Sequence, residues 1–198
     1  MTQTNISKPK GAGKSSFDLI DSKMVFKVLG LEENSIFLDM ACGSGAYSLA
    51  AAEHVGAYGR IYAVDLWQEG IETLRRQAQV RGFLNIRAIV TAAGACGAIE
   101  NESVDVCLLA TALHDMLQTQ DAEGALKEAA RVLKQEGRLI VIEFKKISGP
   151  PGPSVDVRLA AEEVEALVRP HGFKKDRSVE VGPYNYLIQF SRLRTLGA

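Results

Sequence analysis

The feature that most constrains this chain is a glycine pair between an apolar run and an alanine-rich segment. The run Ile36 to Met40 leads into Cys42-Gly43-Ser44-Gly45, and residues 46–55 follow with a helical composition. This order predicts a strand, a tight turn and a helix. Glycine allows backbone conformations that a side chain would penalise, and the first turn of a helix leaves unpaired amides facing the turn. A nucleotide-like ligand is the natural occupant of such a turn.

Two acidic residues indicate which nucleotide fits. The glycine pair alone is a partial match to the dinucleotide fingerprint, which is weak evidence. Asp39, at the end of the first strand, would repel a pyrophosphate but can receive an ammonium group. Asp65 closes the next predicted strand, residues 60–66, where a carboxylate can accept both hydroxyls of a ribose. The alternative is an ordinary α/β unit in which Asp39 only caps the helix.

The combination of these residues resembles the class I S-adenosylmethionine-dependent methyltransferases, whose first motif has the form hh-D-x-x-C-G-x-G. Asp39, Cys42, Gly43 and Gly45 match it, and Asp65 is in register. Residues 131–139 also match the family pattern, and the resemblance covers about residues 17–192. The most similar branch is the one of ubiquinone and menaquinone biosynthesis.

The resemblance implies a function and a set of binding residues. The implied cofactor is S-adenosyl-L-methionine, the product S-adenosyl-L-homocysteine, and the partner a small-molecule acceptor with an oxygen, carbon or nitrogen nucleophile. The acid that often bonds the adenine amino group falls at Ala93, so backbone atoms or a neighbouring residue must hold the adenine. The implied cofactor-binding residues are Asp39, Ala41, Gly43, Ser44, Gly45, Asp65, Leu66, Ala93, Gly94 and Ala110.

A histidine and an aspartate follow another buried strand. Residues 104–111 form a nearly continuous apolar run, typical of a strand covered on both faces, and His114 and Asp115 come directly after it. Ligands of doubly wound sheets lie outside the carboxyl ends of the strands. His114 is therefore the best candidate for a general base or a substrate-orienting group, and Asp115 is the second. Alternatively, His114 only bonds a loop or touches the cofactor.

The remaining pattern alternates strands and helices. Helices are predicted at 17–29, 68–82, 121–134 and 159–168, and strands at 86–91, 139–144, 173–181 and 184–192. This predicts an α/β fold with a doubly wound, Rossmann-like, mostly parallel sheet and helices on both faces. The resemblance implies seven strands and a closing antiparallel hairpin.

The predicted domain organisation is simple. Polar residues 1–16 are expected to form a flexible N-terminal arm, and residues 17–198 a single domain. Residues 148–153 contain three prolines and form a loop. The loop either lines the substrate entrance or is a plain connector.

Composition narrows the remaining classes. A net charge of −1 gives no reason to expect a nucleic acid partner. No apolar run reaches about 18 residues, so no membrane insertion is expected. The three cysteines are too far apart for a metal pattern, which favours no metal site and a cytoplasmic location. A monomer or homodimer is expected. Two other functions stay open: binding of the cofactor without methylation, and nicotinamide-dependent oxidoreduction.

Overall fold

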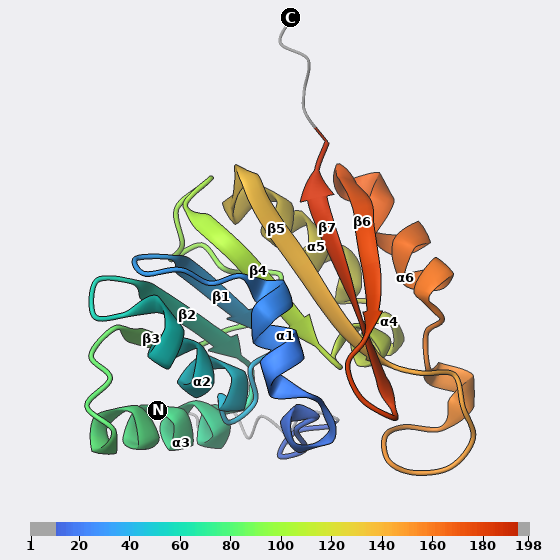
Figure 1. Ribbon diagram of the computed structural model, residues 1–198, viewed down its shortest axis with the longest axis horizontal. Helices are drawn as coiled ribbons and strands as arrows, with labels where there is room; N and C mark the ends of the chain where they lie inside the picture. Colours follow the sequence, from blue (N-terminus) through green and yellow to red (C-terminus); the bar gives the residue numbers. More distant parts are fainter. Residues whose placement is uncertain (1–10, 194–198) are drawn as a thin grey trace, which may run out of the picture.

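A computed structural model describes residues 11–193, and in this part of the chain seven strands form one sheet (Figure 1). The strand order is β3-β2-β1-β4-β5-β7-β6. Strands β3, β2, β1, β4 and β5 are parallel to one another, whereas β7 is antiparallel to both of its neighbours, β5 and β6. The strands are β1 (Ile36–Met40), β2 (Arg60–Asp65), β3 (Ile86–Val90), β4 (Val104–Ala110), β5 (Leu133–Phe144), β6 (Phe173–Glu180) and β7 (Asn185–Arg192). The predicted fold class is confirmed.

Helices cover both faces of the sheet, as right-handed crossovers between parallel strands require. Three helices lie in front of the sheet in Figure 1: α1 (Ser22–Leu29), α2 (Ala46–Val55) and α3 (Gln68–Val80). The second face is covered by α4 (Leu113–Thr119), α5 (Ala122–Val132) and α6 (Ala161–Val168). Short 3-10 turns occur at Phe17–Leu19, Val155–Val157 and Arg169–His171.

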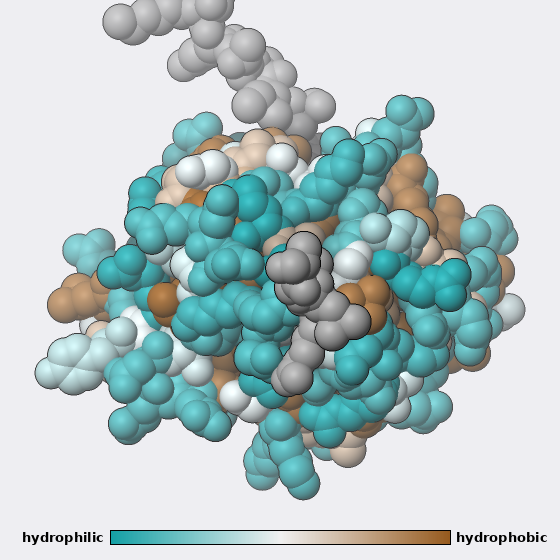
Figure 2. Space-filling model, turned by 90° about the horizontal axis from the view of Figure 1, so that it is seen from above, coloured by the Kyte–Doolittle hydropathy of each residue, from teal (hydrophilic) through white to brown (hydrophobic). Residues whose placement is uncertain are grey.

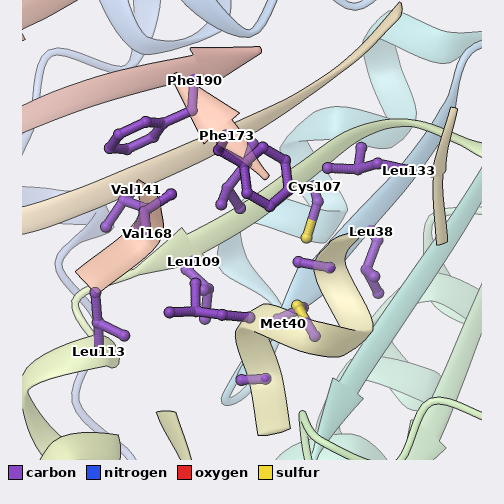
Figure 3. Close-up of a cluster of buried hydrophobic side chains, with 14 of the residues drawn as sticks. Leu38, Met40, Cys107, Leu109, Leu113, Leu133, Val141, Val168, Phe173 and Phe190 are labelled. Atoms are coloured by element: carbon purple, nitrogen blue, oxygen red, sulfur yellow. The ribbon is translucent and has the colours of Figure 1, made fainter. Parts of the chain in front are cut away.

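The core has two sides because successive strand residues point to opposite faces. On β4, Cys107 and Leu109 pack with α5 and α6, in the cluster drawn in Figure 3. Val106 and Leu108 pack with α1 and α2 instead. All four are fully buried, which explains why this strand is an uninterrupted apolar run.

The structure differs from the predicted elements in three places. The predicted helix 17–29 is interrupted, because the side chain of Asp21 accepts a hydrogen bond from Met24 N at 3.0 Å and so caps a new helix, α1. Helix α4, which contains His114, was not predicted. Strand β5 begins at Leu133 instead of 139, so the predicted helical turn at 133–134 is extended backbone. Its pairing with β4 carries a register shift between Val104 and Val106.

Part of the predicted N-terminal arm lies against the domain. Residues 1–10 lie outside the described residues. Ser16 is buried, with 3% of its surface exposed, and its hydroxyl lies 2.9 Å from that of Tyr47 on α2. Ser16 therefore packs on the domain, whereas residues 13–15 are exposed. The segment lies, with the loop after β5, at the end of the sheet where the parallel strands finish (Figure 1).

The opposite end of the sheet, where the parallel strands begin, is mostly hydrophilic on its surface (Figure 2). None of the helices in residues 11–193 combines the length and the apolar character that crossing a bilayer needs.

Candidate active site

The glycine bend after β1 is open on one side and tightly packed on the other. Gly43 and Gly45 have φ angles of +57° and +78°, in the left-handed region that favours glycine. A Cβ on Gly45 would collide with the side chain of Leu74 on α3, whereas a Cβ on Gly43 would meet nothing within 4 Å. A ligand can therefore approach the backbone at Gly43, while Gly45 lets the bend pack on the domain.

Asp39 is buried beside this bend, with 1% of its surface exposed. It accepts a hydrogen bond from the Ser48 hydroxyl at 2.6 Å. Burial raises the pKa of Asp39 from 3.8 to about 7, and the nearby Asp65 carboxylate adds to the rise, while the Ser48 bonds oppose it. The two carboxylates, at the ends of the adjacent strands β1 and β2, therefore lie close enough for the charge of Asp65 to act on Asp39. The predicted neighbour Ala41 has a φ of +58° at the start of the bend.

Asp65 ties the bend to the end of β2. One carboxylate oxygen accepts a bond from Gly43 N at 2.8 Å, and the other accepts one from Trp67 N at 2.7 Å. A carboxylate offers about four acceptor positions. Asp65 is only partly buried, so its oxygens keep acceptor capacity for a ligand's hydroxyl groups.

The residues predicted to surround the adenine differ in how far they are buried and in what they contact. Leu66, next to Asp65, is 43% exposed. Ala93 is partly buried, and Gly94 is exposed. A Cβ on Gly94 would lie 3.1 Å from the backbone of Gly124 at the start of α5, so this glycine serves close packing. Ala110 ends β4.

His114 is held by a residue that the sequence analysis missed. Its Nδ1 lies 2.7 Å from Oε2 of Glu143 on β5, and its backbone N donates to Oε1 of the same carboxylate at 3.1 Å. The histidine is 4% exposed and Glu143 is fully buried. The rings of His114 and Phe144 also lie at a steep angle in an edge-type contact, with 6.2 Å between ring centres. Glu143 is the one charge in the apolar run 139–144, and this was the signal that could have revealed it.

His114 and Asp115 both line a cavity of about 550 Å³ at the ends of β4 and β5. Asp115 Oδ2 lies 3.5 Å from His114 Nε2. The lining mixes polar and apolar residues. The other polar ones are Lys14, Ser15, Ser16, Thr111 and Ser154, and the apolar ones are Leu19, Phe144, Pro151, Pro153 and Val157.

A chain of hydroxyl groups connects this cavity to the glycine-bend helix. Ser16 lies between the Tyr47 hydroxyl at 2.9 Å and the Thr111 hydroxyl at 3.1 Å. The ring of Phe17 packs edge-on against Tyr47. The sequence analysis did not single out Ser16, Tyr47 or Thr111 for this position, because hydroxyl groups far apart in the chain carry no recognisable spacing.

The predicted residues thus fall into two neighbouring groups. Asp39, Gly43 and Asp65 gather at the ends of β1 and β2, and His114 and Asp115 line the cavity at the ends of β4 and β5. A larger hollow of about 830 Å³ lies between α1 and α2 and contains none of the predicted site residues. We therefore assign the candidate site to the smaller cavity and the adjoining bend.

The cysteines show no sign of reactivity. Burial raises the pKa of the Cys42 and Cys107 thiols well above the usual range and that of Cys96 to about 11. Cys42, next to the bend, therefore serves as a small apolar residue.

Comparison with known proteins gives a consistent result. Residues 38–141 match the family model described as a methyltransferase domain. The chain is 26% identical over 163 residues to the ubiquinone/menaquinone biosynthesis C-methyltransferase of Hydrogenovibrio crunogenus, covering 75% of this chain and 63% of that protein. It is 35% identical over 102 residues to the aklanonic acid methyltransferase of a Streptomyces species, covering 52% of this chain and 44% of that protein.

A solved structure supports the same fold. The chain aligns with a SAM-dependent methyltransferase from Aquifex aeolicus with a TM-score of 0.80 and 26% identity, covering 91% of this chain and 94% of that one. This chain thus covers 63% of the length of the Hydrogenovibrio crunogenus protein and 44% of the length of the Streptomyces protein.

Proposed function

Because the chain belongs to the family of methyltransferase domains, we propose that it transfers the methyl group of S-adenosyl-L-methionine to a small-molecule acceptor. The observation that carries this proposal is the pair of carboxylates at the ends of β1 and β2, on either side of an open glycine bend. In this proposal Asp39 receives the amino group of the cofactor, and Asp65 receives the ribose hydroxyls.

The residues present fit such a cofactor. The space in front of Gly43 admits a ligand close to the backbone. A cationic amino group beside Asp39 would favour the ionised carboxylate, which the protein alone stabilises poorly. The exposed side chain of Leu66 can cover one face of an adenine ring. Small residues at Ala93 and Gly94 leave room for the other ring edge.

The proposed chemistry divides between the cofactor and the protein. When bound, S-adenosyl-L-methionine supplies a methyl group on a cationic sulfur that leaves as the neutral thioether of S-adenosyl-L-homocysteine. The protein has to hold the nucleophile in line and exclude water, and such positioning can lower a barrier by about 7–11 kcal/mol. His114 takes the proton that the acceptor loses, at Nε2, while Glu143 orients the ring through Nδ1 and stabilises the imidazolium.

The acceptor cavity favours a planar molecule with one polar edge. The lining combines apolar side chains, among them Phe144 and Pro151, with the polar groups of His114 and Asp115. A hydroxylated aromatic ring or an enol matches this arrangement, because its ring packs on the apolar side chains and its acidic proton points to the histidine. The similarity to a C-methyltransferase of ubiquinone/menaquinone biosynthesis supports this class of acceptor.

We also propose a cytoplasmic location and a small-molecule acceptor. The cysteines of residues 11–193 are free thiols, in keeping with a cytoplasmic location. A small-molecule acceptor, rather than a nucleic acid, suits the near-neutral charge of the chain.

Two measurements test the proposal. Calorimetric titration should give tight binding of S-adenosyl-L-methionine and none of NADH; the opposite result would show a nicotinamide-dependent protein instead. Incubation with S-adenosyl-L-methionine and a panel of hydroxylated aromatic compounds should release S-adenosyl-L-homocysteine. Cofactor binding with no release from any compound would indicate a binding protein that does not methylate this class.

A further inference from the structure

One buried arginine holds the whole loop that follows β5. Arg158 is 1% exposed. Its guanidinium group has five N–H donors, and all five sites are matched by backbone carbonyl oxygens at 2.7–3.1 Å. The acceptors belong to Lys145, Ile147, Gly149, Pro151 and Pro153.

Backbone carbonyl groups, and not an acidic side chain, surround the positive charge of Arg158. Within residues 11–193, Arg158 has no carboxylate partner, and its guanidinium lies over the ring of Phe144, 5.5 Å from the ring centre. Burying a cation is costly unless polar groups surround it. The carbonyl dipoles can do this only when the loop keeps this one conformation, so the side chain and the loop conformation depend on each other.

The loop held in this way forms a wall of the acceptor cavity. Pro151, Gly152 and Pro153 line the cavity together with Phe144. The loop touches that ring directly, since a Cβ on Gly152 would lie 2.7 Å from Phe144. The Phe144 ring in turn contacts the His114 ring. A shift of the loop would therefore change both the cavity wall and the surroundings of the histidine.

We propose that Arg158 is a positioning residue that fixes the loop 145–153 as the apolar wall of the acceptor cavity and thereby determines which planar acceptors fit. This inference rests on the proposed methyl transfer. The loop has almost no other internal order: between β5 and the turn at Val155–Val157, its one backbone hydrogen bond internal to residues 145–154 joins Ile147 N to Lys145 O. The start of the loop is also tied by the ion pairs Lys145–Glu180 and Lys146–Glu163, so the contribution specific to Arg158 is the order of residues 147–153.

The main test compares Arg158→Lys with Arg177→Lys. Lysine keeps the charge but cannot reach five carbonyls, and Arg177 is an exposed residue of β6 that bonds Gln189, so it is a matched control. Hydrogen exchange of the free protein should accelerate at the hydrogen-bonded amides of this segment, those of Lys145, Ile147 and Val157, in Arg158→Lys, with unchanged protection of β4. Exchange in this segment equal to the parent would overturn the ordering role whether or not the protein is a methyltransferase.

Kinetics decide whether the ordered wall matters for the acceptor. With the best compound of the hydroxylated aromatic panel, Arg158→Lys should raise the acceptor KM about tenfold or more and leave the cofactor affinity nearly unchanged. An unchanged acceptor KM, despite faster exchange of the loop, would make Arg158 a connector residue only. A parent protein without turnover would instead refute the proposed function, and the selectivity with it.

A second pair of variants moves the wall without touching Arg158. Gly152 and Gly172 both have positive φ angles, +96° and +85°, but only a Cβ on Gly152 would collide with Phe144, and Gly172 lies outside the loop. Gly152→Ala should therefore raise the acceptor KM as Arg158→Lys does, whereas Gly172→Ala should only lower the thermal stability. Equal acceptor KM values for the two alanine variants would contradict the role of the wall.

Discussion

Asp39 should make the cofactor-free protein less stable as the pH rises. Its pKa is about 7 in the folded protein, mainly because of burial, compared with 3.8 as the ordinary value. Between these two values the folded state binds more protons than the unfolded state. Stability therefore falls with increasing pH across this window, the reverse of the usual behaviour of a carboxylate.

The size of the effect follows from the shift. Each pH unit of the window contributes about 1.4 kcal/mol, so the full cost above pH 7 is about 4 kcal/mol. From pH 5 up to the pKa of about 7, a window of about two pH units, Asp39 is protonated in the folded protein and ionised in the unfolded one. The free energy of unfolding should therefore fall by about 3 kcal/mol between pH 5 and pH 8. Asn is nearly isosteric, can still accept the Ser48 hydroxyl, and has no charge to bury.

The prediction is tested by urea unfolding of the cofactor-free parent and of Asp39→Asn at pH 5 and pH 8. The stability difference between variant and parent should grow by about 3 kcal/mol in favour of Asn at the higher pH. Glu33→Gln, at an exposed position, controls for the loss of one carboxylate and should show no such growth. A difference for Asp39→Asn that stays constant with pH would refute the reasoning, because the carboxyl would then titrate normally.

The remaining predictions concern the bend and the histidine. Asp65→Ala should weaken S-adenosyl-L-methionine binding by about 1–3 kcal/mol in calorimetry through loss of bonds to the ribose, and an unchanged Kd would remove it from the site. His114→Ala should slow turnover and leave cofactor affinity almost intact; the reverse would make it a binding residue. Glu143→Gln should lower stability by about 1.5–3 kcal/mol in urea unfolding, because a bond to a charged group is lost, and should change the tautomer of His114 seen by ¹⁵N NMR, so an unaltered spectrum would contradict its role. Gly45→Ala should cost about 2–4 kcal/mol through its positive φ and the collision with Leu74, and near-parental stability would show that the bend can relax.

The parallel sheet and its helices were largely predictable, because apolar periodicity and glycine positions are local properties. The methyltransferase family was also predictable from the motif around Asp39 and Asp65, and the family match confirms it. The structure brings these two acids together, as parallel strands ending at one edge of a sheet imply. Their contact with the cofactor stays a prediction.

The missed elements have tertiary causes. Helix α4 spans only seven residues, and its N-cap residue, Ala112, has no side chain that could bond the first amides. Its first backbone amides include that of His114, which donates to Glu143, 29 residues further along the chain. The early start of β5 is fixed by pairing with β4, which overrides the helical pattern before Gly137. The pairing of β5 leaves no local trace in the sequence, and the contact of His114 is indicated only by Glu143, the one charge in an apolar run.

Arg158 illustrates a different limit. Its five partners are nearby in sequence, but they are backbone carbonyls, which every residue possesses. The prolines at 150, 151 and 153 predict a loop and give no indication of what orders it. Sequence analysis consequently left the loop as either a substrate-entrance lining or a connector, and the structure shows that it lines the cavity.

The hydrogen-bond partners of the buried charged side chains indicate which of these side chains needs a ligand. Glu143 receives bonds from His114 and from its neighbouring backbone, and Arg158 is surrounded by carbonyls. Among the described residues, Asp39 is bonded only by Ser48 and has a raised pKa. A fully buried acid with so little support reduces stability, and such groups are concentrated at functional sites. The amino group of the cofactor would supply the missing cation, so the cost that Asp39 imposes on the cofactor-free protein becomes binding affinity in the complex.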